Sequence, residues 1–265
     1  VFAIDPTKGS PFNDGKFEGW GTSLCWFANR IGYSDVLAQK AADLLFNAET
    51  GLGMNIARYN IGGGDDPAHH HIIRTDSMMP GFWVLDESTG QHVFDGTKDE
   101  NQRNVLLRAM EACGSSFIAE AFSNSPPYYM TESGCSSGAN SASADNLRPD
   151  QVDAFAQYLA QVALYYQEHY GITFQSISPM NEPNTAYWEA FSPKQEGCHV
   201  SSGERQSTLL LATQKALEDV GLGDILLAGT DETSTVAAGN SFKKLSDEAK
   251  AILDRIDTHS YKIGK

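Results

Sequence analysis

The tripeptide Asn181-Glu182-Pro183 is the part of this sequence that most strongly suggests chemistry. It follows the apolar segment 172–180, which has the composition of a strand, and Pro183 cannot extend a hydrogen-bonded ladder. The carboxylate of Glu182 is therefore expected at the carboxyl end of that strand. In a barrel of parallel strands this end carries the active site, where a carboxyl group can act as a general acid and base. Taken alone, the same tripeptide is also compatible with a surface turn.

Three consecutive histidines, His69 to His71, raise the alternative of a metal site. Consecutive side chains rarely reach one ion together, and the sequence contains no His-Glu-x-x-His motif. The run is therefore interpreted as a solvated polar loop, and neither a metal nor another cofactor is expected.

The cysteines are too widely spaced for a zinc ribbon or a thioredoxin-like pair, because no Cys-x-x-Cys occurs. Cys135 and Cys198 fall in the loops predicted after the third and fourth strands, which are neighbours. In a secreted protein these two are the expected disulfide partners. Cys113 lies in a predicted outer helix and Cys25 near the first strand, so they are less suitable partners.

Short apolar segments alternate with helical patterns along the whole chain. Six segments have the length and composition of strands: 17–24, 54–61, 116–123, 172–180, 224–230 and 256–261. Five helical patterns lie between them, at 34–47, 100–114, 148–171, 203–221 and 241–255. Ser34 is a suitable N-cap, and the glycines that end three of the helices are Gly114, Gly171 and Gly221.

Strands that alternate with helices indicate parallel pairing through crossover connections. Both an open doubly wound sheet and a (β/α)8 barrel fit this order. The long irregular segments follow the second, third and fourth strands, at 62–96, 123–147 and 183–203, whereas the turns from helix back to strand are short. Elaborate loops at one end and tight turns at the other favour an α/β fold of the (β/α)8 TIM barrel type. Residues 1–265 then supply about the first six βα units of the catalytic barrel, with no second domain.

Charge and composition limit the choice of partners. The chain has 265 residues, of which 34 are acidic and 19 basic, for a formal net charge of −15. Such a surface repels phosphate backbones and anionic lipids, so neither nucleic acid nor a membrane is an expected partner. No apolar run reaches the length of a membrane helix. Residues 1–15 lack the basic and apolar segments of a signal peptide, so a secreted or extracytoplasmic protein would already have lost its leader.

Several motifs, in order along the chain, resemble glycoside hydrolase family 30, most closely its endo-β-1,6-galactanase branch. They are 17–26 (FEGWGTSLCW), 54–65 (MNIARYNIGGGD), 122–130 (FSNSPPYYM), 178–183 (SPMNEP), 188–189 (WE), 195–198 (QEGC) and 257–261 (DTHSY). These motifs match the first, second, third, fourth and sixth strand regions of the family's barrel, so the resemblance covers the whole chain.

The resemblance implies a retaining glycosidase that cleaves a β-linked polysaccharide or oligosaccharide with two carboxyl groups. Glu182 matches the general acid/base. Asn181 matches the residue that hydrogen-bonds the 2-hydroxyl group of the sugar, and Arg58 matches the arginine that holds the nucleophile ionised and oriented. His259 and Tyr261 match a polar pair that lines the subsites. Without this chemistry, Arg58 would be a salt-bridge partner inside the barrel.

Aromatic and polar residues near the ends of the predicted strands are candidate sugar contacts, because sugar C–H faces stack on aromatic rings. The aromatic candidates are Trp20, Trp26, Tyr128, Tyr187 and Trp188. The polar candidates are Asn60, Asp65, Asn124 and Glu196. For each aromatic residue, a place in the core is the alternative interpretation.

The resemblance also implies a nucleophilic glutamate at the end of the seventh strand, about 5 Å from the first carboxyl group. The sequence stops at Lys265, so this glutamate, the last two strands and the family's usual β-sandwich are expected beyond Lys265, in a missing C-terminal segment of the same protein. Asp231 and Glu232 are the nearest carboxylates and are interpreted as subsite or structural groups. Two other functions stay open: a non-catalytic sugar-binding protein, and a metal-dependent barrel hydrolase that uses the histidines.

Overall fold

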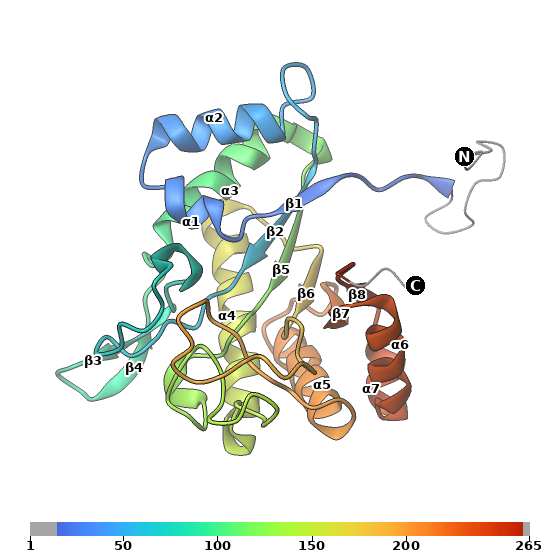
Figure 1. Ribbon diagram of the computed structural model, residues 1–265. Helices are drawn as coiled ribbons and strands as arrows, with labels where there is room; N and C mark the ends of the chain where they lie inside the picture. The colour runs from blue at the N-terminus through green and yellow to red at the C-terminus, as the bar shows by residue number, and fades with distance from the viewer. Residues whose placement is uncertain (1–14, 262–265) are drawn as a thin grey trace.

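The computed structural model describes residues 15–261, and its centre is a curved sheet of six strands (Figure 1). The strands are β1 (Gly21–Ser23), β2 (Ile56–Asn60), β5 (Ile118–Phe122), β6 (Ser176–Ser178), β7 (Leu226–Glu232) and β8 (Arg255–Thr258). They pair in the order β1-β2-β5-β6-β7-β8, and every pairing is parallel. Six sequential parallel strands with helices between them form part of a (β/α)8 barrel, which confirms the predicted fold class. The signal-peptide prediction concerns the first residues, which lie outside the described part, as does Lys265.

The helices follow the strands in the predicted alternation. They are α1 (Phe27–Ile31), α2 (Asp35–Leu45), α3 (Glu100–Cys113), α4 (Val152–Tyr170), α5 (Glu204–Asp219), α6 (Thr235–Lys244) and α7 (Asp247–Ile252). The Ser34 hydroxyl accepts a hydrogen bond from the Leu37 amide at 3.4 Å, which confirms the predicted N-cap of α2. Gly171 ends α4 with a left-handed φ of 65°, as a glycine can without steric cost.

One predicted helix is wrong in extent. The pattern at 241–255 predicts a single helix, but α6 already begins at Thr235, and a break separates its end from α7. At this break the Ser246 hydroxyl accepts a hydrogen bond from the Ala249 amide at 3.1 Å and starts a new helix. The N-cap therefore overrides the helical propensity of the surrounding residues.

Side chains alternate across the strands, so each strand has a face toward the helices and a face toward the inside of the curve. In β2, Ala57 and Tyr59 are fully buried in the apolar core, whereas Arg58 between them lines a cavity on the inner side. The parallel register places polar residues of four neighbouring strands in one row: Ser23, Arg58, Glu120 and Ser176. The inner face of the sheet is therefore polar, and the outer face carries the core.

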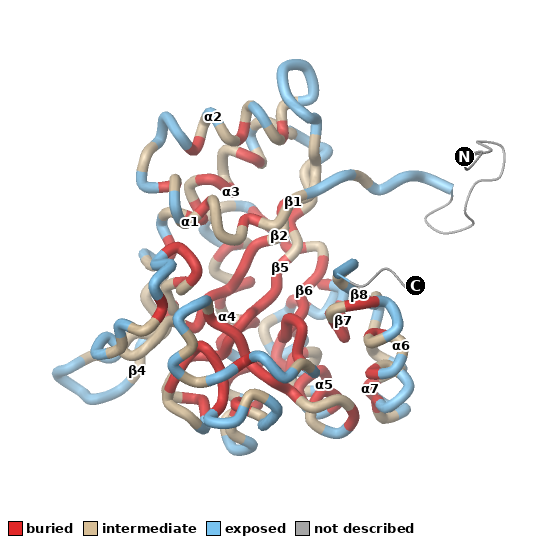
Figure 2. Tube along the Cα trace, viewed as in Figure 1, coloured by how far each residue is buried: buried red, intermediate tan, exposed pale blue. Residues whose placement is uncertain are grey.

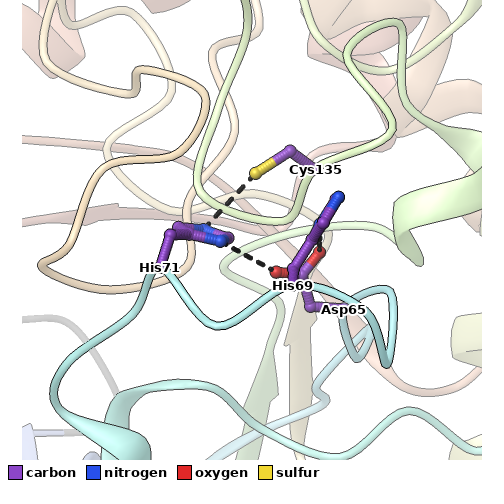
Figure 3. Close-up of side chains that lie close together, drawn as sticks. All are labelled: Asp65, His69, His71 and Cys135. Carbon is purple, nitrogen blue, oxygen red and sulfur yellow. Dashed lines mark hydrogen bonds and ion pairs between the residues drawn. The ribbon is translucent and has the colours of Figure 1, made fainter.

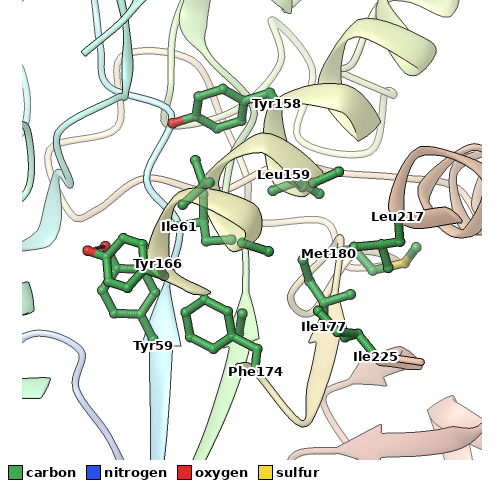
Figure 4. Close-up of a cluster of buried hydrophobic side chains, with 14 of the residues drawn as sticks. Tyr59, Ile61, Tyr158, Leu159, Tyr166, Phe174, Ile177, Met180, Leu217 and Ile225 are labelled. Atoms are coloured by element: carbon green, nitrogen blue, oxygen red, sulfur yellow. Dashed lines mark hydrogen bonds between the residues drawn. The ribbon is translucent and has the colours of Figure 1, made fainter. Parts of the chain in front are cut away.

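The apolar core fills the space between the sheet and the helices, and the buried tube segments of Figure 2 follow the strands and α4. Helix α4 contributes Tyr166, which lies near Tyr59 and Phe174 in Figure 4, and Tyr158, which lies apart from them. The ring centroids of Tyr59 and Tyr166 are 5.0 Å apart, and their hydroxyl groups are 2.6 Å apart. Fully burying one such side chain contributes about 1.5–3 kcal/mol, so this cluster gives the strand ends a rigid support.

An antiparallel hairpin interrupts the loop between β2 and α3, where the sequence predicts only irregular chain. Its strands are β3 (Trp83–Asp86) and β4 (Gln91–Phe94). The Gly90 amide closes the turn on the Asp86 carbonyl at 2.7 Å, and the Trp83 indole donates to Gln161 of α4 at 2.6 Å. Short 3₁₀ segments occupy Thr75–Ser77, Gly114–Ser116, Tyr128–Met130 and Pro149–Gln151. Among the helices of residues 15–261, none combines the length and apolar composition needed to cross a membrane.

Candidate active site

A cavity of about 770 Å³ opens at the carboxyl ends of the strands. Each of the six strands contributes to its wall, either directly or through the segment that follows the strand. Ser23 of β1, Arg58 of β2 and Glu120 of β5 come from the strands themselves. The volume falls in the range of small-molecule sites, and the position is the one that parallel barrels use for catalysis.

Glu182, which follows β6, is held in this cavity by its backbone and by both carboxyl oxygens. Its φ of 46° is uncommon for a residue other than glycine, and its amide donates to the Asp231 carbonyl at 2.8 Å. Oε1 lies 3.1 Å from Nδ1 of His259, and Oε2 accepts a hydrogen bond from the Tyr187 hydroxyl. Only 6 % of the residue is exposed. A buried carboxyl group on an unfavourable backbone is typical of a functional position.

The segment after Glu182 folds back on it. The indole of Trp188 and the hydroxyl of Thr185 both donate to the Glu182 carbonyl, each at 3.0 Å. Burial, the hydrogen bond to Glu182 and the charge of that carboxylate together raise the pKa of Tyr187. The phenol therefore stays protonated at neutral pH and remains a hydrogen-bond donor to Glu182.

An arginine–carboxylate pair stands beside Glu182. Nη2 of Arg58 lies 2.5 Å from Oδ2 of Asp231 and also donates to Oδ1 of Asn181 at 3.4 Å. The guanidinium carbon of Arg58 sits 3.4 Å from the centroid of the Phe122 ring, a cation–π arrangement that fixes its plane. Three neighbours therefore fix the Arg58 guanidinium, and the Asp231 side chain beside it is only 4 % exposed.

His259 lies between the two carboxylates. Its Nδ1 is 3.1 Å from Oε1 of Glu182, and its Nε2 is 3.3 Å from Oδ1 of Asp231. The backbone amide of His259 donates to the Glu232 carbonyl at 2.8 Å, and the ring stacks on Tyr261 with centroids 5.2 Å apart. These contacts set the position of both carboxyl groups relative to one imidazole.

Residues 10–259 match the family model described as O-Glycosyl hydrolase family 30. The chain belongs to glycoside hydrolase family 30.

Two curated relatives of this family-30 chain have names that specify a β-1,6 linkage. Endo-beta-1,6-galactanase from Hypocrea rufa is 33 % identical over 278 residues, which cover 100 % of this chain and 56 % of the relative. Exo-beta-1,6-galactobiohydrolase from Bifidobacterium longum is 27 % identical over 346 residues, which cover 95 % of this chain and 22 % of the relative. The chain therefore spans about half of the first relative and about a fifth of the second.

Solved structures agree with the fold. A conserved exported protein from Bacteroides fragilis superimposes with a TM-score of 0.70 at 25 % identity, over 82 % of this chain and 44 % of that protein. The catalytic domain of GH30 xylanase C from Talaromyces cellulolyticus superimposes with a TM-score of 0.66 at 21 % identity, over 92 % and 53 % of the two chains. The six-stranded partial barrel therefore shares its fold with about half of a GH30 catalytic domain.

Most residues that the family-30 motifs predict for the site lie together in the cavity. They are Trp26, Arg58, Asn124, Asn181, Glu182, Tyr187, Trp188, His259 and Tyr261. Five further candidates do not line it: Trp20, Asn60, Asp65, Tyr128 and Glu196. Strand position and the motifs together therefore identify the residues around Glu182, but not every residue that they predict belongs to the cavity wall.

Two of the predicted substrate contacts, Asn60 and Asp65, lie elsewhere. Asn60 is fully buried under the loops, where its side-chain amide donates to Oε1 of Glu196 at 2.6 Å. Asp65 turns toward His69 and His71, away from the cavity wall. Glu196 of the loop after β6 contacts Asn60, and Ser136 of the loop after β5 contacts Asp65. A position near the end of a strand does not reveal such contacts between loops.

Glu196 is a fully buried carboxyl group that joins two loops. It accepts hydrogen bonds from the Asn60 amide at 2.6 Å and from the Met79 backbone at 2.9 Å. Burial, opposed by these hydrogen bonds, raises its pKa to about 8. The folded protein therefore keeps Glu196 largely protonated at neutral pH.

We expect the unfolding free energy to fall as pH rises from about 5 to 8. In this range the folded protein holds a proton on Glu196 that the unfolded chain, with an ordinary glutamate pKa, has released. The contribution of Glu196 to the unfolding free energy is fully present below the glutamate pKa of the unfolded chain. It is lost as the pH rises to about 8 and is on the order of a few kcal/mol. Urea unfolding of Glu196→Gln should show a shallower pH dependence than the wild type, while the exposed control Glu189→Gln should match the wild type. Equal slopes for all three proteins would contradict the assignment.

The sequence did not identify two other carboxylates of the cavity, and it left the role of a third, Asp231, undecided. Glu120 and Asp257 line it, and Arg255 pairs with them at 2.8 Å and 3.1 Å. Glu120 alternates with buried alanines in β5, a pattern that indicates an inward-facing acidic position. Asp231 lines the cavity, whereas its neighbour Glu232 does not.

Of the two neighbours Asp231 and Glu232, Glu232 has a structural role. It accepts hydrogen bonds from Gln206 at 3.1 Å and from Ser241 at 2.7 Å, and burial raises its pKa. These contacts link β7 to α5 and α6, on the helix side of the strand. Alternation along β7 thus separates Asp231 from Glu232.

The predicted disulfide is wrong, because all four cysteines are free. The Cys135 sulfur lies 3.4 Å from His71 and 3.3 Å from the Ser137 hydroxyl. Cys198 belongs to the apolar core, where burial raises the pKa of its thiol to about 12. Their loops are neighbours, but the two side chains face different surroundings.

Proposed function

We propose that this chain carries the acid/base part of a retaining β-glycosidase that cleaves β-1,6-linked galactan, with Glu182 as general acid and base. One observation carries the proposal: Glu182, within the residues that match family 30, lies in the cavity with its two carboxyl oxygens in contact with His259 and Tyr187. The name of the Hypocrea rufa relative, 33 % identical across the whole of this chain, supports galactan as the substrate.

In the first step, the Glu182 carboxyl group gives its proton to the glycosidic oxygen as the bond to the leaving sugar breaks. A second carboxylate attacks the anomeric carbon from the opposite face and forms a glycosyl–enzyme ester. In the second step, the Glu182 carboxylate takes a proton from water, and the resulting hydroxide displaces the enzyme carboxylate from the sugar. The contacts to His259 and Tyr187 restrict rotation of the carboxyl group and keep it aimed at one site.

Asn181 and Arg58 orient the sugar and the second carboxylate in this scheme. Because Oδ1 of Asn181 accepts from Arg58, its amide hydrogens remain available for the 2-hydroxyl group of the sugar. Such a hydrogen bond strengthens as positive charge develops at the neighbouring carbon. The Arg58 guanidinium, fixed over Phe122, keeps an adjacent carboxylate ionised.

We assign the nucleophile to a glutamate C-terminal to Lys265 in the whole protein. The family-30 relatives are longer than this chain, which spans 56 % of the Hypocrea rufa enzyme. Among the carboxylates of residues 15–261, Asp231 is the strongest substitute. It is already paired with Arg58 and placed beside His259, so we assign it to a subsite.

Aromatic side chains on the cavity wall supply affinity for a neutral sugar. Tyr187 and Tyr261 are 46 % and 71 % exposed and can present ring faces to a sugar, as can the partly buried Trp26. Trp188 is only 4 % exposed and donates to the Glu182 carbonyl, so its role is to position the acid/base. A polysaccharide substrate also implies action outside the cytoplasm, and the Bacteroides fragilis neighbour is described as exported.

The stereochemistry of the product tests this proposal. The whole protein is incubated with β-1,6-galactan, and proton NMR follows the reducing ends as they appear. Retention predicts that the β-anomer forms first and the α-anomer appears only through mutarotation. Initial release of the α-anomer would exclude the two-step mechanism. Binding without any hydrolysis would favour a sugar-binding protein instead.

A further inference from the structure

Four potential metal ligands gather beside the catalytic cavity, in the loops after β2 and β5 (Figure 3). They are Asp65, His69, His71 and Cys135, and one ligand atom from each lies within 4.8 Å of all the others. None of these four lines the catalytic cavity. The histidine run therefore does not behave as a simple solvated loop: its first and third members turn inward, while His70 between them is exposed.

The ligand atoms lie near the spacing that one tetrahedral ion requires, since one atom from each of the four residues is within 4.8 Å of the other three. Zinc binds nitrogen and oxygen at about 2.0–2.2 Å and sulfur at about 2.3 Å, so neighbouring ligands of a tetrahedron stand roughly 3.3–3.7 Å apart. Here Oδ1 of Asp65 is 3.2 Å from Nδ1 of His69, and its Oδ2 is 3.6 Å from Nδ1 of His71. The Cys135 sulfur lies 3.4 Å from the other ring nitrogen of His71, Nε2. Only one of the two nitrogens can bind the ion, so the place of Cys135 in the set rests on the 4.8 Å limit that one atom from each residue meets.

Two buried atoms of the cluster have no hydrogen-bond partner. They are Oδ2 of Asp65 and Nδ1 of His71. The Asp65 side chain has no exposed area, and that of His71 is 11 % exposed. Leaving a buried carboxylate oxygen and a ring nitrogen unpaired is costly, and a cation bound between them would satisfy both.

We propose that Asp65, His69, His71 and Cys135 bind one Zn²⁺ ion as a structural site. A thiolate and two imidazoles exclude the hard cations Mg²⁺ and Ca²⁺, which take oxygen ligands, and suit Zn²⁺. The carboxylate and the thiolate carry two negative charges, which the ion neutralises. Because the protein supplies all four ligands, no position remains for a catalytic water.

The groups around the cluster support the ligands in the way that metal sites require. The Cys135 sulfur accepts from the Phe191 amide at 3.3 Å and lies 3.3 Å from the Ser137 hydroxyl. Oδ1 of Asp65 accepts from the Ser136 amide at 3.1 Å. The Phe191 ring packs edge-on against both imidazoles, with centroids 5.1 and 5.5 Å away. Such neighbours orient the ligands.

The ion would join three loops that shape the catalytic face. Its ligands come from the loops after β2 and β5, and Phe191 brings in the loop after β6. The next residue, Ser192, donates its amide to Ser137 at 3.1 Å and lines the catalytic cavity, as does Lys194. The proposed zinc therefore stabilises one wall of the cavity without taking part in bond cleavage.

Metal analysis of the whole protein tests this site. After purification and dialysis, elemental analysis should find about one zinc per chain. The protein stripped with a chelator should take up Co²⁺ and develop the visible bands of tetrahedral cobalt together with a sulfur-to-cobalt charge-transfer band in the near ultraviolet. Wild-type protein that, once stripped, takes up neither zinc nor cobalt would overturn the proposal.

Matched variants identify the ligands. Cys135→Ser should remove the charge-transfer band and lower zinc affinity by more than about 100-fold, beyond the 10- to 100-fold typical of residues that only orient ligands. His71→Ala should lower zinc affinity by a similar factor while leaving the sulfur band at saturating cobalt. The controls Cys113→Ser and His70→Ala should keep one zinc per chain, since neither residue belongs to the cluster. An unchanged cobalt spectrum in Cys135→Ser would refute the site.

Discussion

Glu182→Gln is expected to lower the turnover of β-1,6-galactan by roughly 10²- to 10⁴-fold in the whole protein, the usual contribution of a general acid. The amide has nearly the size of the carboxyl group and can still accept the hydrogen bond from Tyr187. It has no proton to give to the glycosidic oxygen, so the leaving sugar must depart as an alkoxide. The measurement is kcat on the polysaccharide, with thermal unfolding to verify that the variant is folded.

Substrates with good leaving groups separate this role from a structural one. An aryl galactoside whose phenol leaves without protonation should retain much of its first-step rate in Glu182→Gln. The exposed Glu189, in the same loop, provides a matched control, and Glu189→Gln should hydrolyse both substrates normally. Near-normal turnover of polysaccharide by Glu182→Gln would remove the acid/base assignment.

The order of strands and helices could be predicted because it depends on local pattern. Buried parallel strands are short apolar runs, and outer helices carry an apolar stripe with recognisable ends, such as Ser34 and Gly171. The hairpin at residues 83–94 could not be predicted in this way because its strands are partly buried and the surrounding loop is polar. It is fixed by tertiary contacts, among them the bond from Trp83 to Gln161 on a distant helix.

The centre of the site was predictable for a related reason. A residue at the carboxyl end of a parallel strand must face the loops, so strand position and the family motifs together suffice to place Glu182, Arg58 and His259 in one cavity. Which of two adjacent residues points inward depends on register, and sequence left Asp231 and Glu232 undistinguished. Alternation along β7 assigns the first to the cavity and the second to the helix side.

The proposed metal site shows where prediction from sequence stops. His69 and His71 are close in the chain, but Cys135 lies in another loop, 64 residues from His71. The path of an irregular loop follows from specific packing, such as the contact of the Phe191 amide with the Cys135 sulfur. A rule based on spacing correctly predicts that three consecutive histidines do not bind one ion together. It does not reveal that the first and third can meet ligands from another loop.

The chain ending at Lys265, assayed alone, is expected to show no hydrolysis of β-1,6-galactan, whereas the whole protein should be active. Glu182 could still protonate a leaving group, but no carboxylate would stand at the nucleophile's position to trap the anomeric carbon. Catalytic groups that act as a unit lose nearly all of their effect when one is absent. The pair of Arg58 and Asp231, which this chain keeps, does not replace the missing step.

The same chain is also expected to be poorly soluble. Strands β1 and β8 are the edges of the six-stranded sheet, and Ile256 in β8 is 47 % exposed. Unpaired strand edges and an uncovered barrel interior favour association between chains. Size-exclusion chromatography and galactan assays of the two proteins, purified side by side, test both expectations. A monodisperse and fully active 1–265 chain would refute them and move the nucleophile to a carboxylate already described. Asp231 would then be the first candidate, because it lies in the cavity, and Asp231→Asn would have to abolish the activity of that chain.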